Sequence, residues 1–193
     1  FLFTALIPLK WTISSLVDST NVISSKAAIL NQIYVPKSIF VIVRLGINTT
    51  KFFVGLVVLF LFIWVYGIDF SFNVFYLPFI LIVHALFLLG AMMILAHIGV
   101  YLRDVKNMMQ YVTRMLFYVS PVMFSIDSVA DKLAQWLYLN PLTILFESYR
   151  SVLLYQETPF WSGLGYLLIV SVILVVIGIF VMEKYDKKYI KVI

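Results

Sequence analysis

The sequence predicts an all-α integral membrane protein, and three observations lead to that prediction. Of the 193 residues, 63% are hydrophobic and only 12% are charged, whereas a soluble domain is about half apolar and about a quarter charged. Several apolar runs reach the roughly 20 residues that a helix needs to cross a bilayer. Lys and Arg gather in alternate connections, which is typical of a multi-pass membrane protein. An ordinary soluble domain and a disordered chain are therefore excluded.

Three segments meet the length and polarity expected of a membrane-spanning helix. Residues 38–66 include the charge-free run 52–66, and residues 72–102 and 159–182 carry no formal charge at all. As a helix, each of these segments can satisfy all of its backbone N–H and C=O groups with hydrogen bonds of its own, which the hydrocarbon core requires because it offers none.

Two shorter segments are predicted to cross as well, which gives five transmembrane helices. Residues 1–17 are interrupted by Pro8 and Lys10, and residues 107–124 become apolar after their first turn and reach the Ser-Pro pair at 120–121. The chain begins without Met inside an apolar run, and we interpret it as a fragment of a longer protein.

The charges in the connections predict the orientation of the spans. Connections rich in Lys and Arg stay in the cytoplasm. The basic connections are 18–37, 102–107 and the tail 183–193, and the remaining two, 67–71 and 125–158, carry more acidic than basic residues. Five crossings then alternate without conflict, and the C-terminus is predicted to be cytoplasmic. The net charge of +5 is a topology signal on this interpretation, and no nucleic-acid partner is expected.

The long connection 125–158 is predicted to form two short helices. Ser128, followed by an acidic residue three positions on, resembles a capping box. Asn140 and Pro141 supply an N-cap and a first-turn proline for a second helix. Neither helix can cross the membrane, so we expect an extracytoplasmic re-entrant or interfacial hairpin. Glu147 and Arg150 lie three residues apart and can pair, either as a structural ion pair or as a gate at the outer mouth.

One polar stripe interrupts the predicted span 38–66. Arg44, Asn48 and Lys51 follow i, i+4, i+7 spacing and share a helical face. Either this half of the helix protrudes into water, with its long side chains reaching the surface, or the stripe faces an aqueous vestibule that receives an anionic substrate.

A second stripe runs along the predicted helix 107–124 and the residues before it. Arg103, Asn107, Gln110 and Arg114 again share one face, with Tyr111 and Tyr118 beside it. In one interpretation the first two lie at the membrane surface and Arg114 pairs with a carboxylate of a neighbouring helix. In the other, this helix lines a route through the membrane, because ionisable residues inside a membrane are usually functional.

No catalytic or metal site is visible in the sequence. The chain has no cysteine, and His84 and His97 lie thirteen residues apart without a third ligand, so we expect them to be hydrogen-bonded core residues. The phosphate-binding pattern G-x-x-x-x-G-K-[ST] is missing, which excludes ATP binding through such a loop. We expect a protein that is not an enzyme.

Four stretches in order carry a resemblance to a known family. They are NQIYVP at 31–36, YLRD at 101–104 leading to FYVSPV at 117–122, NPLT at 140–143, and ESYR at 147–150. With these stretches the chain resembles the permease subunit of ABC-2-type exporters of polysaccharides and polyol phosphates, the group that exports O-antigen, capsule and teichoic acid.

The resemblance implies one transmembrane domain over 1–193, cut from a six-span permease whose N-terminal amphipathic helix and first span are missing here. It implies a homodimer in the bacterial cytoplasmic membrane that works with two separate ATPase subunits, which hold ATP and Mg, and moves a lipid-linked glycan. Residues 22–33 resemble the coupling helix that docks on the ATPase. That helix would place Lys26 and Asn31 outward and use apolar Ile29, Leu30 and Ile33 to fill a groove, unless it is a simple membrane-surface helix.

The same resemblance suggests the substrate path. Tyr111, Phe117 and Tyr118 match an aromatic lining for sugar rings, and the hairpin with Asn140, Pro141, Glu147 and Arg150 would shape the exit. Both polar stripes could receive the pyrophosphate of the lipid carrier. The alternatives are an ABC-2 permease for small lipophilic molecules, or a channel or structural membrane subunit outside the ABC class.

Overall fold

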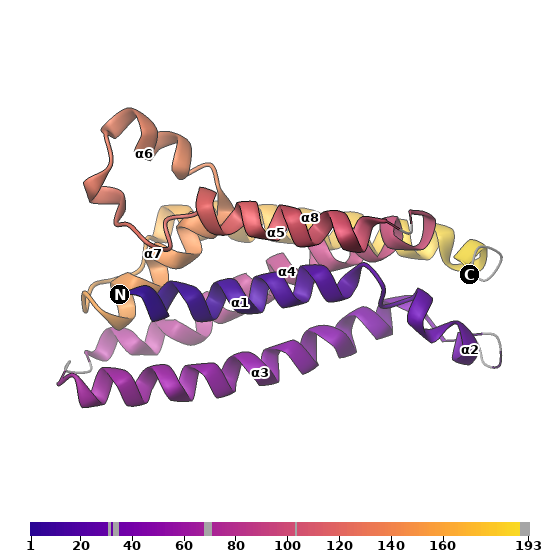
Figure 1. Cartoon of the computed structure of the whole chain (residues 1–193), viewed down its shortest axis with the longest axis horizontal. Helices are drawn as coiled ribbons and strands as arrows, with labels where there is room; N and C mark the ends of the chain where they lie inside the picture. The colour runs from indigo at the N-terminus through magenta and orange to yellow at the C-terminus, as the bar shows by residue number, and fades with distance from the viewer. Residues whose placement is uncertain (31, 33–34, 68–70, 103, 190–193) are drawn as a thin grey trace.

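The computed structural model describes residues 1–30, 32, 35–67, 71–102 and 104–189, and every regular element within them is helical. Figure 1 shows an elongated bundle of long helices with short helices at both ends. The long helices are α1 (Leu2–Ser19), α3 (Lys37–Val65), α4 (Leu77–Tyr101), α5 (Val105–Val119) and α8 (Trp161–Tyr189). The short ones are η1 (Ser24–Lys26), α2 (Ala27–Leu30), η2 (Phe72–Tyr76), η3 (Ile126–Ser128), α6 (Asp131–Leu137) and α7 (Pro141–Leu153). The predicted all-α class is confirmed.

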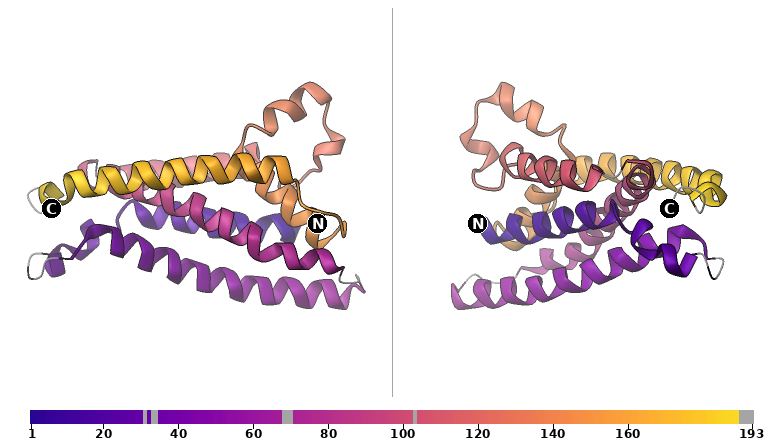
Figure 2. Two further views of the ribbon diagram at one scale, coloured as in Figure 1. Left: turned by 180° about the vertical axis from the view of Figure 1, so that it is seen from behind. Right: turned by 45° about the vertical axis from the view of Figure 1, so that its right-hand side comes forward.

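Successive long helices run in opposite directions along the bundle. The connection 20–36, the link from α4 to α5 and the end of α8 lie at one end, and the α3–α4 and α5–α8 connections lie at the other (Figures 1 and 2). The described parts of the connection 20–36, the start of α5 and the end of α8 therefore share one end of the molecule, and the described parts of the α3–α4 and α5–α8 connections share the other, as alternating crossings predict.

Three helical segments are long and apolar enough to cross a membrane. They are Lys37–Val65, Phe72–Tyr101 and Trp161–Asp186. In the first and last of these, only 28% and 22% of the most apolar window is buried, so most of their apolar side chains face outward, as lipid contact requires. At 1.5 Å per residue, α1 and α5 are about 27 and about 22 Å long, short of a hydrocarbon core of about 30 Å. The five-span count stays a prediction.

Helices α4 and α8 form the most extensive helix pair, and glycine allows their close approach. A Cβ atom built on Gly90 of α4 would lie 2.6 Å from the Cβ atom of Leu174, and one on Gly178 of α8 would lie 2.7 Å from the Cβ atom of Met93. Small residues let membrane helices approach until their backbones are nearly in contact. The α4–α8 pair is the platform on which the other helices pack.

Helix α1 lies at the centre of the bundle, in contact with α3, α4, α5 and α7. Its Trp11 side chain is 3% exposed and stacks on Phe52 of α3, with ring centroids 4.4 Å apart. The indole also packs against His84 of α4 at 4.5 Å. The position of α1 explains why a segment interrupted by a proline and a lysine is nonetheless half buried: its neighbours surround it.

In the connection between α5 and α8, the structure agrees with the predicted helix starts in the second half only. Asn140 caps α7 as predicted, because its side-chain oxygen accepts a hydrogen bond from the backbone N–H of Leu142 at 3.0 Å. The predicted capping role of Ser128 is wrong: this residue lies in η3, donates to the carbonyl of Ser125, and precedes a helix that begins only at Asp131. Helix α6 stands away from the bundle (Figure 1), and the re-entrant hairpin stays a prediction.

The substitution Gly90→Ala tests the close packing of α4 on α8. The new methyl group has no room, and overpacking of this kind costs about 1–3 kcal/mol. We expect a lower midpoint of thermal unfolding in detergent. The matched control is Gly46→Ala in α3, where nothing lies within 4 Å of the added Cβ atom. Because alanine has a higher helix propensity than glycine, we expect the free energy of unfolding of Gly46→Ala to be unchanged or higher by up to about 1 kcal/mol. Equal melting of both variants would contradict this packing argument.

Candidate functional site

Three adjoining cavities open along one face of α1. The largest, about 520 Å³, lies between α1 and α5. A second of about 350 Å³ lies toward the connection 20–36, and a third of about 410 Å³ lies between α1 and α3. Asp18 lines the first two cavities and Ser14 lines the first and third. The three cavities therefore form one continuous surface.

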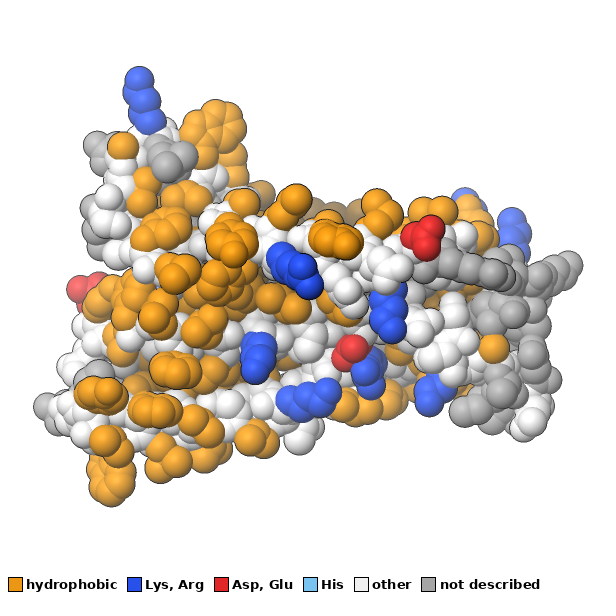
Figure 3. Space-filling model, in the orientation of Figure 1, with side chains coloured by type: hydrophobic (Ala, Val, Ile, Leu, Met, Phe, Trp, Pro, Cys, Tyr) orange, Lys and Arg blue, Asp and Glu red, His pale blue; other side chains and the backbone are white. Residues whose placement is uncertain are grey.

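Nearly all of the charged side chains on this surface are cationic, and we call the surface the basic face. Figure 3 shows several blue side chains close together on one face of the bundle, with a red group among them and another beside them. Among the described residues that line the three cavities, the charged ones are Lys10, Lys26, Arg44, Lys51, Lys106 and Arg114, with Asp18 as the one carboxylate. Such an excess of positive charge beside apolar spans is costly in lipid, so the face requires water or an anionic partner.

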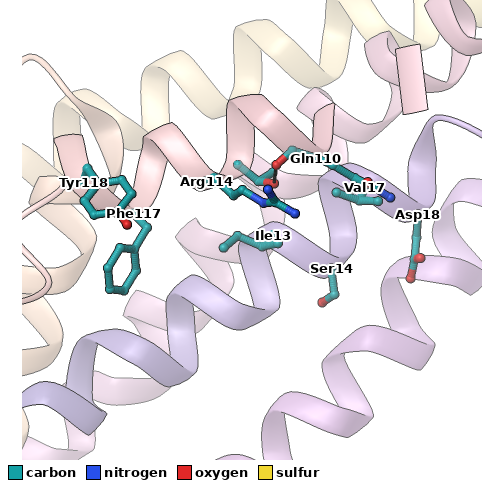
Figure 4. Close-up of a pocket in the computed structure, with 9 residues that line it drawn as sticks. Ile13, Ser14, Val17, Asp18, Gln110, Arg114, Phe117 and Tyr118 are labelled. Carbon is teal, nitrogen blue, oxygen red and sulfur yellow. Dashed lines mark hydrogen bonds between the residues drawn. The ribbon is translucent and has the colours of Figure 1, made fainter. Parts of the chain in front are cut away.

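Helical spacing explains how the basic face forms. Lys10, Ser14 and Asp18 follow one another at intervals of four residues and share one side of α1. Gln110 and Arg114 do the same on α5, and their side of α5 faces α1. Figure 4 shows the Arg114 side chain extending from α5 toward α1, with Phe117 and Tyr118 at one end of the cavity and Asp18 at the other.

Asp18 organises the polar stripe of α3. Its Oδ2 atom accepts hydrogen bonds from Arg44 Nη2 at 2.9 Å, Arg44 Nε at 3.0 Å and Asn48 Nδ2 at 3.0 Å. Lys51 Nζ in turn donates to Asn48 Oδ1 at 3.4 Å. The network fixes α1 to α3. The side chains of Arg44 and Asp18 are 38% and 24% exposed, so water weakens this ion pair and its contribution to stability is modest.

Arg114 is exposed at the basic face. Its guanidinium lies 5.8 Å from the centre of the Tyr111 ring, a cation–π contact. Within the described part of the chain, no carboxylate lies within ion-pair distance of Arg114. The interpretation in which Arg114 forms a structural ion pair finds no partner among the described residues.

The sequence stripes account for part of this face. Gln110, Arg114, Phe117 and Tyr118 line the α1–α5 cavity, and the tyrosines at 111 and 118 are 64% and 76% exposed. Asn107 is exposed at the start of α5, and Arg103 lies outside the described residues. Sequence reasoning missed the contributions of Lys10, Ser14, Asp18 and Lys106. The four-residue spacing of the first three was the signal that could have found them.

The predicted coupling helix over 22–33 is helical in part of its described length. The chain forms two short helical turns, η1 and α2, over residues 24–30. Lys26 is exposed as predicted, but Leu30 is only 4% exposed and packs inside this chain. Leu30 is therefore not on an outward face that could fill a partner's groove. Asn31, Ile33 and the side chain of Ile29 lie outside what the structure describes.

The predicted pair in α7 is confirmed as a buried ion pair. Arg150 Nη1 lies 2.9 Å from Glu147 Oε1, and the Arg150 side chain is fully buried. The guanidinium also donates to the backbone carbonyls of Val122 at 2.8 Å and Phe124 at 3.4 Å. Together with the bond from Asn140 Nδ2 to Ser120 Oγ at 3.0 Å, these contacts hold the segment after α5 against α7.

Both histidines are hydrogen-bonded, as the sequence predicts. Thr12 Oγ1 donates to the Pro8 carbonyl at 3.0 Å, so it accepts from His84 Nε2 at 2.9 Å. His84 Nδ1 then carries no hydrogen and accepts from the Tyr149 hydroxyl at 3.2 Å. This buried chain joins α1, α4 and α7 through one neutral tautomer. His97 Nδ1 lies 2.8 Å from the Tyr189 hydroxyl.

The substitution Tyr149→Phe tests the buried chain. It leaves His84 Nδ1 without a donor in an apolar interior, which costs about 1–3 kcal/mol. We expect a lower midpoint of thermal unfolding in detergent. Tyr166→Phe removes the same hydroxyl from a side chain that is 53% exposed, and it serves as the matched control with unchanged melting. Unaltered stability of Tyr149→Phe would argue against the hydrogen-bonded chain.

Comparison with known proteins now gives the family. The model of the ABC-2 type transporter family matches residues 2–154, and the chain belongs to this family. An "O-antigen export system permease protein RfbA" of Klebsiella pneumoniae is 24% identical over the whole chain and 74% of its own length. A protein of the same name from Myxococcus xanthus is 26% identical over 90% of this chain and 68% of its own length. The family excludes a channel outside the ABC class and makes the chain a membrane transport subunit.

Proposed function

We propose that this chain is the membrane-spanning subunit of an ATP-driven exporter that moves a lipid-linked polysaccharide or polyol phosphate polymer across the bacterial cytoplasmic membrane. The observation that carries the proposal is the basic face, in a member of a family whose matched relatives are named O-antigen export permeases. An ABC-2 permease for small lipophilic molecules would have little use for six cations beside its spans.

The chemistry of the basic face suits the two parts of such a substrate. Lys and Arg side chains bind phosphate through charge-assisted hydrogen bonds, and several of them offset the cost of bringing a pyrophosphate into the membrane. The exposed rings of Tyr111 and Tyr118 on α5 offer flat apolar surfaces with a polar tip, which suit sugar rings. The phosphate would bind at the basic face while the glycan follows α5 toward the outer hairpin.

The proposed transporter has further parts that this chain does not supply. A second copy of the chain would complete the conduit, and separate ATPase subunits would hold ATP and Mg and dock at the connection 20–36. In this arrangement all five long helices cross the membrane, the C-terminus is cytoplasmic, and the α6–α7 hairpin gates the outer mouth.

The substitution Arg114→Gln tests the role of the basic face. A charge-assisted hydrogen bond is worth about 1.5–3 kcal/mol, so export of the glycan should fall about tenfold or more. Arg114 is exposed and lacks an ion-pair partner among the described residues, so folding and ATPase binding should be preserved. Export is measured by surface glycan against cytoplasmic glycan–lipid.

The matched control is Lys188→Gln, which removes one positive charge from an exposed residue near the end of α8, away from the basic face. It should export normally. Wild-type export by Arg114→Gln at equal protein level would refute the proposed role of this side chain.

A cross-linking experiment tests ATPase docking. The chain has no cysteine, so Lys26→Cys and Ser128→Cys in the full-length protein each provide one defined attachment point in this region. Both positions are exposed, and they lie at opposite ends of the bundle. A thiol-reactive photo-cross-linker should attach the ATPase to the cysteine at position 26 and not to the one at position 128. The reverse pattern, or no adduct from either position, would contradict the docking proposal.

A further inference from the structure

The connection 20–36 is fixed to the α4–α8 pair at both of its ends. At its start, the backbone of Thr20 lies so close to Gly99 of α4 that an added Cβ atom would collide with the Thr20 carbonyl. At its end, Lys37, the first residue of α3, forms an ion pair with Asp186 of α8. Neither end of the connection can move without moving these neighbours.

The ion pair at the second end is well shielded from water. Lys37 Nζ lies 3.2 Å from both Oδ1 and Oδ2 of Asp186, and the two side chains are 1% and 14% exposed. A buried ammonium loses its hydration and therefore depends on its partner. The pair joins two helices that otherwise touch little, because α8 packs chiefly on α4. It is an electrostatic contact between the first residue of α3 and the end of α8.

A second contact fixes the same end of α8 to α4. Burial, with Tyr101, Asp186 and Tyr185 nearby, raises the pKa of Tyr189, so its hydroxyl stays protonated and shares a hydrogen bond with His97 Nδ1. The end of α8 is therefore attached to α3 through Asp186 and to α4 through Tyr189. Displacement of Lys37 would therefore act on the end of α8 and, through Tyr189, on α4.

Helix α8 continues unbroken from this point to the other end of the bundle. It is 29 residues long, and its first turn packs on the outer hairpin, because a Cβ atom on Gly163 would lie 2.9 Å from Cγ2 of Ile144 in α7. A straight helix transmits a shift along its axis with little loss. The base of α3 and the outer hairpin are thus connected through one rigid element.

We propose that the Lys37–Asp186 ion pair is a positioning pair that transmits movement of the connection 20–36 to α8, and through α8 to the α6–α7 hairpin. The inference rests on the proposed function, in which the ATPase docks at this connection. It assigns to two residues, 149 positions apart, the coupling of ATP hydrolysis to opening of the outer mouth.

The test measures export per ATP hydrolysed in the full-length permease with its ATPase. We expect D186N and K37M to bind the ATPase and hydrolyse ATP, but to export about three- to tenfold less glycan for each ATP. The charge swap K37D/D186K should recover most of that loss. A merely structural pair would lower the amount of assembled complex and leave the export per ATP of the remainder unchanged.

A matched control lies on the same turn of α8. K184M removes an ammonium from an exposed position, and it should not change export per ATP. If D186N fails to assemble, K37M/D186L removes both charges and lets the site pack. That variant should then show the same uncoupling.

The outcomes separate this inference from the proposed function. Wild-type export per ATP in D186N or in K37M/D186L, in a permease that otherwise exports glycan, would overturn the inference alone, as would a swap variant that assembles but stays uncoupled. Failure of the unaltered permease to bind an ATPase or to export glycan would overturn the proposed function instead.

Discussion

The close approach of α4 and α8 is the contact on which the rest of the structure depends. Lipid tails are as apolar as the side chains that contact them, so the hydrophobic effect does not drive membrane helices together. They associate through complementary shape and dispersion contacts instead. Gly90 and Gly178 provide that shape, since each faces the other helix where no side chain fits. The remaining helices use this platform: α1 and α7 pack on α4, and α3 is joined to the end of α8 by the Lys37–Asp186 pair.

The basic face follows from the place of α1 in this arrangement. Because α1 packs between α3 and α5, its Lys10, Ser14 and Asp18 side meets the polar side of each neighbour. Asp18 accepts hydrogen bonds from Arg44 and Asn48, so these two side chains are bound within the chain. Arg114, by contrast, has no such partner in the described part of the molecule. The two polar stripes that look alike in the sequence thus differ physically: both line the cavities, but the stripe on α3 also bonds to Asp18 of α1, whereas Arg114 pairs with no carboxylate among the described residues.

Sequence periodicity predicted the features that depend on near neighbours along the chain. The length of the apolar segments predicted α3, α4 and α8. The N-cap preference of Asn and the i, i+3 spacing of opposite charges predicted the Asn140 cap and the Glu147–Arg150 pair. Features set by distant contacts were not predictable in this way. The bond between Arg44 and Asp18 joins residues 26 positions apart, and Leu30 belongs to the buried core of the chain. The prediction that Ser128 caps a helix is wrong for a local reason, because the Ser128 hydroxyl donates to the backbone carbonyl of Ser125.

Helix α3 links the two functional proposals mechanically. Its first residue, Lys37, is held by α8, and further along the same helix Arg44 and Lys51 belong to the basic face. A rigid helix cannot move at its base without displacing these side chains, so a force on the connection 20–36 reaches the basic face and α8 together. Binding of an anionic substrate at the basic face would in turn bias the position of the same helix, because coupling between two sites is reciprocal. Substrate binding and ATP-driven movement would then shift the same equilibrium, which is the position of α3. That position is set by the Asp18 network on α1 and by the ion pair with the end of α8.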